Sequence, residues 1–173
     1  MKKILETPRL YLRKMTQADY ADLCEILQDE KAMYAYEHAF SDTEAQEWLD
    51  KQISRYKNDG FGLWAVIDRE KGTFLGQCGI TWQSVNGEQV PEIGYLFKRK
   101  YWHNGYASEA AQGCKRYAFD MLGFDRVYSI IRDNNIASQN VARRNGMKVV
   151  KTFVKHYYGM DMPHLVFCVE KSK

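Results

Sequence analysis

The chain has 173 residues, of which 45% are hydrophobic, 14% aromatic and 27% charged. These values exclude an intrinsically disordered chain and are typical of one globular domain with a sizeable packed core. The net charge of +3 comes from 25 basic and 22 acidic residues, and this even balance does not indicate nucleic-acid binding. We therefore expect a single domain over residues 1–173 and no nucleic-acid partner.

The cysteines and the N-terminal residues indicate the cellular compartment. Four cysteines are scattered without a C-x-x-C pair, so we expect reduced thiols rather than a disulfide framework or a zinc site. No cluster of His, Cys, Asp or Glu has the spacing of metal ligands. The N-terminal stretch MKKILETPRL lacks the apolar region of a signal peptide, and no window is apolar enough to span a membrane. We expect a cytoplasmic protein without a metal.

Hydrophobic periodicity divides the chain into seven strands and four helices. The expected elements are, in chain order, a strand over 8–13, helices over 16–28 and 41–59, strands over 61–68, 73–82 and 90–97, a helix over 107–121, a strand over 126–131, a helix over 135–145, and strands over 148–155 and 165–170. Ser41 and Glu44 form a capping box, and Asn86-Gly87 indicates a hairpin turn. The order predicts an α/β (α+β) fold with a mixed, mostly antiparallel sheet of about seven strands and about four flanking helices.

Residues 92–121 contain the clearest chemical signal, a strand, a basic turn and a helix. The strand places Ile93, Tyr95 and Phe97 on one face and Glu92, Gly94 and Leu96 on the other. Gly94 suggests a bulge, or a close approach of another backbone or of a ligand. The helix connects this strand to strand 126–131, and we expect these two strands to be parallel neighbours.

The turn before this helix has the properties of an anion site. The first N–H groups of a helix have no intrahelical partner, and its dipole adds about half a positive charge there. Gly105 lets the backbone approach a phosphate, and Lys98, Arg99 and Lys100 add positive charge. Many strand–turn–helix units bind nothing, so local chemistry alone leaves both interpretations open. The stretch matches neither a Walker A loop nor a G-x-G-x-x-G fingerprint.

Two sequence blocks carry a family resemblance. The first is Trp102-His103-Asn104-Gly105-Tyr106-Ala107, extended by Ser108-Glu109-Ala110, and the second is Asn135-Ile136-Ala137-Ser138 with Arg144-Asn145-Gly146-Met147. The first is similar to the acetyl-CoA motif (Q/R)-x-x-G-x-(G/A) of the GNAT (GCN5-related) N-acetyltransferase superfamily, with Trp102 in place of Gln or Arg. The second resembles the signature N-x-A-S … K-x-G-(F/M) of the RimJ/RimL-like branch, which acetylates ribosomal-protein N-termini.

The resemblance implies the GNAT fold, a sheet that splays apart between its central parallel strands, and acetyl-CoA as the co-substrate. The pantetheine arm of acetyl-CoA fills that gap in the family and pairs like an added strand. The residues that the resemblance assigns to the cofactor are Tyr95, Leu96, Phe97, Trp102, His103, Asn104, Gly105, Tyr106, Ala107, Ser108, Asn135 and Ser138.

Three residues are candidates for catalysis. The resemblance makes Glu92 a base for the amine, although it could equally pair with a nearby Arg or Lys. It also suggests the N–H of Leu96 as the donor to the oxyanion. Ala142 stands where many family members have a tyrosine that acts as the general acid. The resemblance to the branch therefore points to Ser138 as the proton donor to sulfur. Ser138 is also an ordinary helix-capping residue type, and a thiolate can leave without an acid.

The acceptor site is the least defined part of the prediction. Its candidates are Tyr34, Tyr36, Glu37, His38, Trp82 and Tyr157, although such aromatics more often belong to a core or a rim. The leading hypothesis is an acetyl-CoA-dependent N-acetyltransferase acting on a primary amine, with a protein N-terminal amine suggested by the branch. Alternatives are a small-molecule acetyltransferase for amino acids, polyamines or antibiotics, and a non-catalytic acyl-CoA-binding module. We expect a monomer or a homodimer.

Overall fold

The computed structural model describes residues 2–36, 38–157 and 159–173, apart from the side chain of Tyr157. The elements are β1 (Lys3–Glu6), β2 (Leu10–Arg13), α1 (Tyr20–Leu27), α2 (Asp42–Asn58), β3 (Leu63–Asp68), β4 (Phe74–Val85), β5 (Glu88–Phe97), α3 (Tyr106–Asp120), β6 (Arg126–Arg132), α4 (Ile136–Arg144), β7 (Lys148–Tyr157) and β8 (Met160–Glu170), with short 3₁₀ turns η1 (Gln17–Asp19), η2 (Tyr34–Tyr36) and η3 (Arg99–Tyr101).

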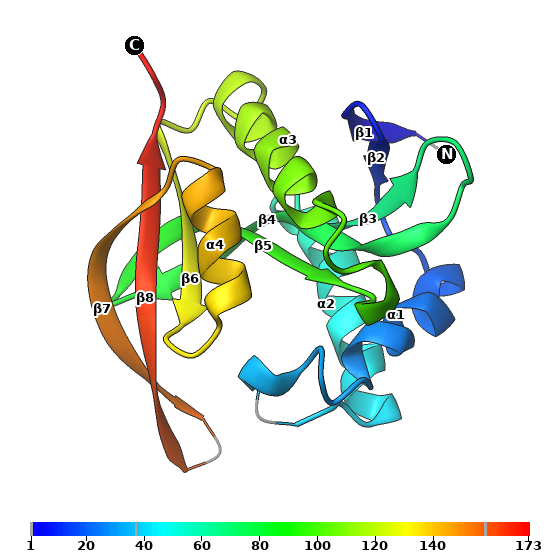
Figure 1. The fold of residues 1–173 in the computed structure, drawn as a ribbon, viewed down its shortest axis with the longest axis horizontal. Coiled ribbons are helices and arrows are strands. Elements are labelled where there is room, and N and C mark those ends of the chain that lie inside the picture. Colours follow the sequence, from blue (N-terminus) through cyan, green and yellow to red (C-terminus); the bar gives the residue numbers. More distant parts are fainter. Residues whose placement is uncertain (1, 37, 158) are drawn as a thin grey trace.

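The strands form one mixed sheet in the order β1-β2-β3-β4-β5-β6-β8-β7 (Figure 1). The central pair β5–β6 is parallel, and the other neighbours run antiparallel. The predicted fold class is confirmed. The strand count is eight rather than about seven, because β1 pairs with β2 as an additional edge strand. Its four residues, KILE, are too short to show an alternating pattern.

Two helical layers cover the two faces of the sheet. On one face, α3 and α4 bury small and branched side chains against the strands: Ala110, Ala111, Cys114, Ala118, Val141 and Ala142. On the other face, α1 and α2 bury larger residues: Leu23, Ile26, Leu27 and Leu49. Each such leucine contributes about 2 kcal/mol through burial. The small residues of α3 let this helix lie close to β4 and β5, which fixes its N-terminus beside the end of β5.

Local signals set the ends of two of these elements. The Ser41 hydroxyl accepts from the Glu44 N–H at 3.2 Å while the Glu44 carboxylate accepts from the Ser41 N–H at 3.0 Å, so the predicted capping box begins α2. Asn86 and Gly87 both have positive φ, 51° and 84°, as a tight hairpin between β4 and β5 requires.

The sheet splays between β5 and β6. The two strands pair only where Glu92 lies beside Tyr128, and β5 then continues alone toward Phe97. On its other edge, β5 keeps regular register with β4 from Glu88 to Phe97. The bulge expected at Gly94 is therefore absent from the ladder between these two strands. The gap therefore opens beside a β5 strand that stays regularly paired with β4.

The described residues also bear on membranes and metals. No helix among them is long and apolar enough to cross a membrane. No three His, Cys, Asp or Glu side chains within the described parts of the chain gather into a group that could hold a metal ion.

Candidate active site

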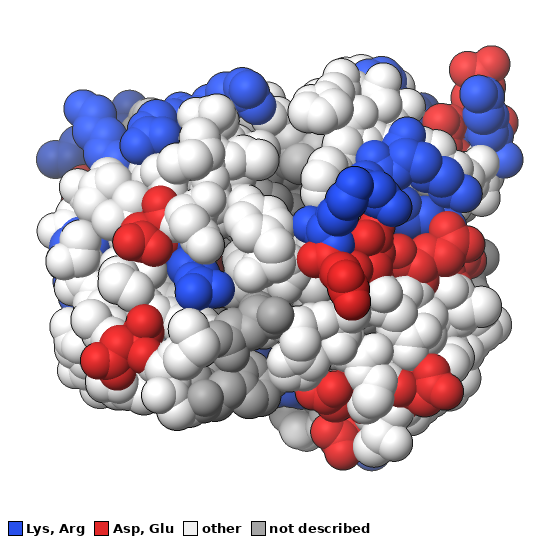
Figure 2. Space-filling view, turned by 60° about the horizontal axis from the view of Figure 1, so that its bottom comes forward, with Lys and Arg blue, Asp and Glu red and all other residues white. Residues whose placement is uncertain are grey.

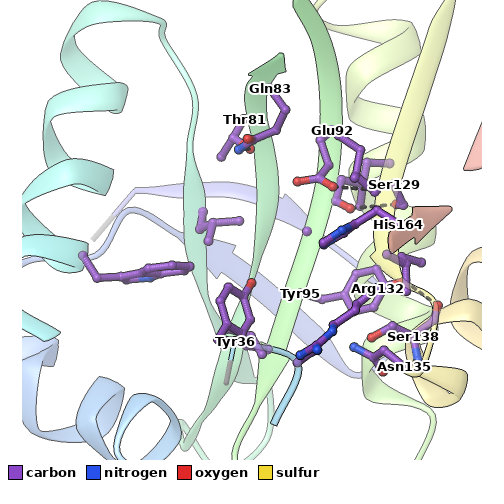
Figure 3. Close-up of a pocket in the computed structure, with 18 of the residues that line it drawn as sticks. Tyr36, Thr81, Gln83, Glu92, Tyr95, Ser129, Arg132, Asn135, Ser138 and His164 are labelled. Atoms are coloured by element: carbon purple, nitrogen blue, oxygen red, sulfur yellow. Dashed lines mark hydrogen bonds between the residues drawn. The ribbon is translucent and has the colours of Figure 1, made fainter. Parts of the chain in front are cut away.

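A cavity of about 350 Å³ lies where β5 and β6 separate. Its walls come from α2, the connection before it, and strands β3 to β8 (Figure 3). Several predicted site residues line it: Tyr36, Glu92, Tyr95, Leu96, Asn135 and Ser138. Residues separated by more than a hundred positions in the sequence thus share one cleft.

The backbone of β5 decides which amides open into this cleft. Along a strand, the N–H and C=O groups of successive residues point alternately to its two edges. The Lys98 N–H donates to the Leu75 carbonyl of the β4 side at 3.0 Å, so even-numbered residues at this end of β5 face β4. The expected role of the Leu96 N–H as oxyanion donor is therefore wrong, because that amide points toward β4.

The odd-numbered residues of β5 face the cleft instead. The Ile93 carbonyl accepts from the Ser129 hydroxyl at 2.7 Å, and the Phe97 carbonyl accepts from Trp102 Nε1 at 3.0 Å. Tyr95 lies between them and beyond the last β5–β6 pair, so its N–H and C=O open into the gap. On this edge of β5, it is therefore the Tyr95 N–H, and not the Leu96 N–H, that opens into the cleft.

Glu92 lies at the fork of the splayed strands. Its carboxylate accepts from the Ile130 N–H of β6 at 2.6 Å and so replaces a backbone partner at the point where the ladder stops. Burial raises the pKa of Glu92 to about 7, against that hydrogen bond and the positive charges of Lys155 and Arg55. A carboxylate with this pKa can accept a proton near neutral pH.

The turn before α3 has the geometry of an anion site. Gly105 has a φ of 79°, and α3 begins at Tyr106, one residue before the expected start. A side chain at this position would start in contact with Arg9 Nη2, 3.4 Å from the Cβ position. His103, Asn104 and Gly105 are exposed, so the helix N-terminus is open to a ligand.

The charge at this turn comes from residues other than those expected. Lys98, Arg99 and Lys100 face acids of the first helical region: Lys98 lies 2.7 Å from Asp22, and Arg99 2.9 Å from Asp29. Figure 2 shows basic side chains lying against acidic ones over the part of the molecule that holds α1. The expectation that these three residues serve a phosphate is therefore not supported by their contacts.

Arg9 and Arg144 lie closer to the helix start. Arg9 binds Glu109 through Nε at 2.7 Å and donates to the Asn104 carbonyl at 2.9 Å. Its guanidinium also lies over the Tyr106 ring. Arg144 donates to the Ser108 hydroxyl at 3.3 Å. These contacts place two arginines at the first turn of α3. Neither belongs to the basic run Lys98–Lys100, and both are distant from this turn in the sequence.

The start of α4 brings Asn135 and Ser138 to the cleft. Asn135 Oδ1 caps the helix by accepting from the Ser138 N–H at 3.2 Å. The Ser138 carbonyl accepts from the Tyr95 hydroxyl at 2.8 Å, which bridges β5 and α4 across the gap. Among the described residues, the Ser138 hydroxyl makes no hydrogen bond. Asn135 provides the cap, and the Ser138 hydroxyl remains for the cleft.

Only some of the residues predicted for the acceptor site line the cavity. Tyr36 lines the cavity, and Tyr34 donates to Asn135 Oδ1 at 2.8 Å instead of lining it. His38 lies 3.1 Å from Glu44. Glu37 and the side chain of Tyr157 lie outside the described residues.

The assignment of Trp82 to the acceptor site is wrong. Thr81 and Gln83 line the cavity, so the intervening Trp82 points to the opposite face of the sheet. There it packs against Phe61 and Phe124, with ring centroids 5.9 and 5.4 Å away.

Residues 9–148 match the acetyltransferase (GNAT) domain family. The chain belongs to this family. YkkB of Bacillus subtilis (strain 168), an uncharacterised protein, is 38% identical over 152 residues, which cover 87% of this chain and 88% of YkkB. YnaD of the same organism, an uncharacterised N-acetyltransferase, is 30% identical over 145 residues, covering 83% and 82%.

Solved structures share the architecture. A GNAT-family acetyltransferase from Bacillus anthracis matches with a TM-score of 0.81 at 25% identity, covering 96% of this chain and 97% of the other. RimL, a ribosomal L7/L12 α-N-protein acetyltransferase solved with coenzyme A, matches at 0.78 and 17% identity over 98% of each chain, which shows a common fold.

This GNAT acetyltransferase is an acyltransferase that uses acetyl-CoA as its co-substrate. The structure offers two features that fit such a molecule. The cleft-facing edge at Tyr95 can pair with the amides of a pantetheine arm, and the N-terminus of α3 can bind its phosphates.

Sequence reasoning missed the cationic side chains that also line the cavity. They are Lys51, Arg55, Arg132 and Lys155, joined by His164. Lys51 and Arg55 are four residues apart on α2 and could have been recognised as one helix face. Arg132 and His164 are brought together by the β6–β8 pairing, and no local motif indicates it.

His164 is a second group in the GNAT cleft that can accept a proton. Its Nδ1 lies 2.7 Å from the Met162 carbonyl, which can only accept, so Nδ1 carries the proton and Nε2 keeps a lone pair. Burial lowers the pKa of His164, which keeps the imidazole neutral near pH 7.

Proposed function

We propose that the chain acetylates a small primary amine by direct attack on acetyl-CoA in a ternary complex, with Glu92 as the general base. The observation that carries this proposal is the position of Glu92. It is a partly buried carboxylate with a pKa of about 7, three residues before Tyr95, whose cleft-facing amide is the first beyond the last β5–β6 pair. A base and an oxyanion donor on one strand are what amide formation from a thioester needs.

The reaction divides among the residues of the cleft. The amine nitrogen bonds to the thioester carbonyl carbon, and its surplus proton passes to Glu92. The Tyr95 N–H donates to the oxygen that becomes negative. When the C–O double bond reforms, the C–S bond breaks and its electrons leave with sulfur. The Ser138 hydroxyl, unused by the helix cap, is placed to donate a proton to that thiolate and to recover one from solvent, while the proton on Glu92 is released to solvent.

The size of the cavity supports a small acceptor. About 350 Å³ is at the lower end of sites for small molecules. A second candidate is a protein N-terminal amine, which the motif resemblance to the RimJ/RimL-like branch favours at residues 105–110 and 135–138. We also propose a cytoplasmic location, which fits the four free cysteine thiols.

The test follows CoA release with acetyl-CoA and a panel of amines: amino acids, a polyamine, an aminoglycoside and a peptide with a free N-terminus. We expect the kcat/KM of the wild-type enzyme to rise with pH through about 7 as Glu92 ionises. Glu92→Gln keeps an acceptor for the Ile130 N–H, should lower kcat about 10²- to 10⁴-fold, and should remove this limb of the pH profile.

Glu88→Gln is the matched control, because Glu88 is an exposed carboxylate on the same strand. This variant should retain the rate and the pH profile of the wild type. An unchanged profile in Glu92→Gln would transfer the role of base to His164 or to water.

A further inference from the structure

Four cationic side chains line the cavity together. Lys51 and Arg55 reach the cavity from α2, and Arg132 and Lys155 reach it from β6 and β7. Among the described residues that line the cavity, Glu92 is the one carboxylate. The described part of the wall therefore carries four basic side chains and one carboxylate.

Strand register explains how one side of this group is held. Arg132 lies opposite His164 in the β6–β8 ladder, and His164 lies opposite Phe153 in the β7–β8 ladder. Residues opposite one another in a ladder share a face of the sheet. Lys155 follows Phe153 by two positions and so shares that face. In Figure 3, Arg132 lies at one side of the pocket, toward Tyr36 and Asn135, and Glu92 lies at the other beside His164.

Among the described residues, Lys51, Arg55 and Arg132 form no ion pair. Burial, with the positive charges of Arg55 and Lys155, lowers the pKa of Lys51. Burial also lowers the pKa of Arg55, against the opposing negative charges of Asp59 and Glu92. Arg55 donates to Gln52 Oε1 at 3.2 Å, a neutral partner. The Nε atom of Arg132 is buried without a hydrogen-bond partner among the described residues. A buried guanidinium N–H that lacks a hydrogen-bond acceptor is costly unless a ligand supplies one.

We infer that the acceptor of this enzyme carries an anionic group, in the simplest case a carboxylate, beside the amine that is acetylated. The anion binds at Arg132 and the α2 cations, and the amine lies toward Glu92. This inference rests on the proposed function and names its class of substrate. It disfavours polyamines as acceptors, because the charged side chains that line the described part of the cavity are mostly basic.

The cleft also accommodates the remainder of such a molecule. Tyr36, Phe40 and Trp48 form an aromatic wall, with ring centroids between 5.8 and 6.3 Å apart. An amino acid or a peptide with an acidic residue near its N-terminus could present the same pair of groups, so both sources enter the test.

The first measurement compares matched acceptors that differ only in the anion. Glycine and phenylalanine are compared with glycinamide, phenylalaninamide and phenethylamine, and peptides with Asp or Asn at the second position form a second arm. Because an amide lowers the pKa of the neighbouring amine, kcat/KM is expressed per neutral amine. We expect the anionic member of the best pair to be preferred at least about tenfold.

The second measurement removes the charge. Arg132→Gln should lower kcat/KM for the anionic acceptor about 30-fold or more, and for its neutral partner less than about threefold. Arg55→Gln should act in the same direction. Lys57→Gln is the matched control, since it removes one exposed positive charge from α2 outside the cavity. Equal losses for both acceptors would overturn the inference.

A binding measurement separates this inference from the proposed function. Calorimetry on the complex with CoA compares N-acetylglycine and N-acetylphenylalanine with their amides, and it needs no turnover. Tighter binding of the acids, weakened by Arg132→Gln, supports the anion site even if Glu92 is not the base. Equal or undetectable binding of every pair overturns it, whereas acetylation of polyamines alone would keep the proposed function and reject the anionic acceptor.

Discussion

The two ends of the cleft are built in opposite ways. The end that we propose for the cofactor is built mainly by one continuous stretch, from the edge of β5 through the turn at Gly105 to the first turn of α3. The end that we propose for the acceptor is assembled from α2 and strands β5, β6, β7 and β8. The first can be read as a motif because its chemistry is local, while the second exists only after the sheet has formed.

The basic residues of the two ends also differ in how easily their role can be predicted from the sequence. The basic run Lys98–Lys100 is conspicuous in the sequence, yet its members are paired with acids that α1 and the chain just after it supply. Lys51, Arg55 and Arg132 are inconspicuous in the sequence, yet they lie in the cavity without an ion pair to any described residue. A run of like charge therefore indicates binding less well than a cation that the fold leaves without a counterion.

The largest expected effect on cofactor binding belongs to the turn at Gly105. Gly105→Glu places a side chain and a negative charge at the start of α3, and we expect acetyl-CoA affinity to fall at least about 100-fold by calorimetry. Gly87→Glu is the control for backbone strain, because Gly87 also has positive φ, 84°, and open space around it. Comparable losses in both variants would assign the effect to strain rather than to the phosphate site.

The sequence predicted the fold well where signals were local. The capping box at Ser41, the Asn86-Gly87 turn and the strand–turn–helix unit all lie where they were expected. The strand β1 was missed because a short edge strand is stabilised by its partner rather than by its own pattern.

The site residues were predicted less well, for two reasons. The direction of an amide depends on pairing, so the shift from Leu96 to Tyr95 required the β4–β5 ladder. The Arg132–His164 neighbourhood required the register of β6 and β8, and the placement of Trp82 on the far face required knowing which side of β4 faces the cavity.

The next effect concerns the stability of the protein and arises at the acceptor end of the cleft, at Glu92. The pKa of Glu92 is about 7 in the folded protein against an ordinary value of 4.5, so ionisation of this carboxylate costs stability. The cost is absent below pH 4.5 and complete above about pH 7, where it reaches at most about 3 kcal/mol. Glu92→Gln should therefore melt at a higher temperature than the wild type at pH 8, with a smaller difference at pH 5. A difference that does not change with pH would show that this carboxylate ionises as easily in the fold as in water.

A smaller effect on the rate is expected at the start of α4, where Ser138 lines the cleft. Ser138→Ala should lower kcat about tenfold and leave the melting temperature unchanged, because Asn135 and not the Ser138 hydroxyl caps α4. Asn135→Ala should instead lower the free energy of unfolding by about 1 kcal/mol, because it removes the cap of α4. A full-rate Ser138→Ala enzyme would mean that the thiolate leaves without help from this side chain.

The smallest expected effect tests the contrast in charge directly. Lys98→Gln should change acetyl-CoA affinity less than about twofold, because the Lys98 ammonium is buried between Asp22 and Glu25, at 2.7 and 3.2 Å. Arg9→Gln should weaken binding severalfold, with a smaller dependence on salt, because Arg9 lies at the first turn of α3 although it is 96 positions before Gly105. Titration of both variants with acetyl-CoA at two salt concentrations measures this difference. If Lys98→Gln has the greater effect, the basic run binds the phosphates after all, and its pairing with α1 must open when the cofactor arrives.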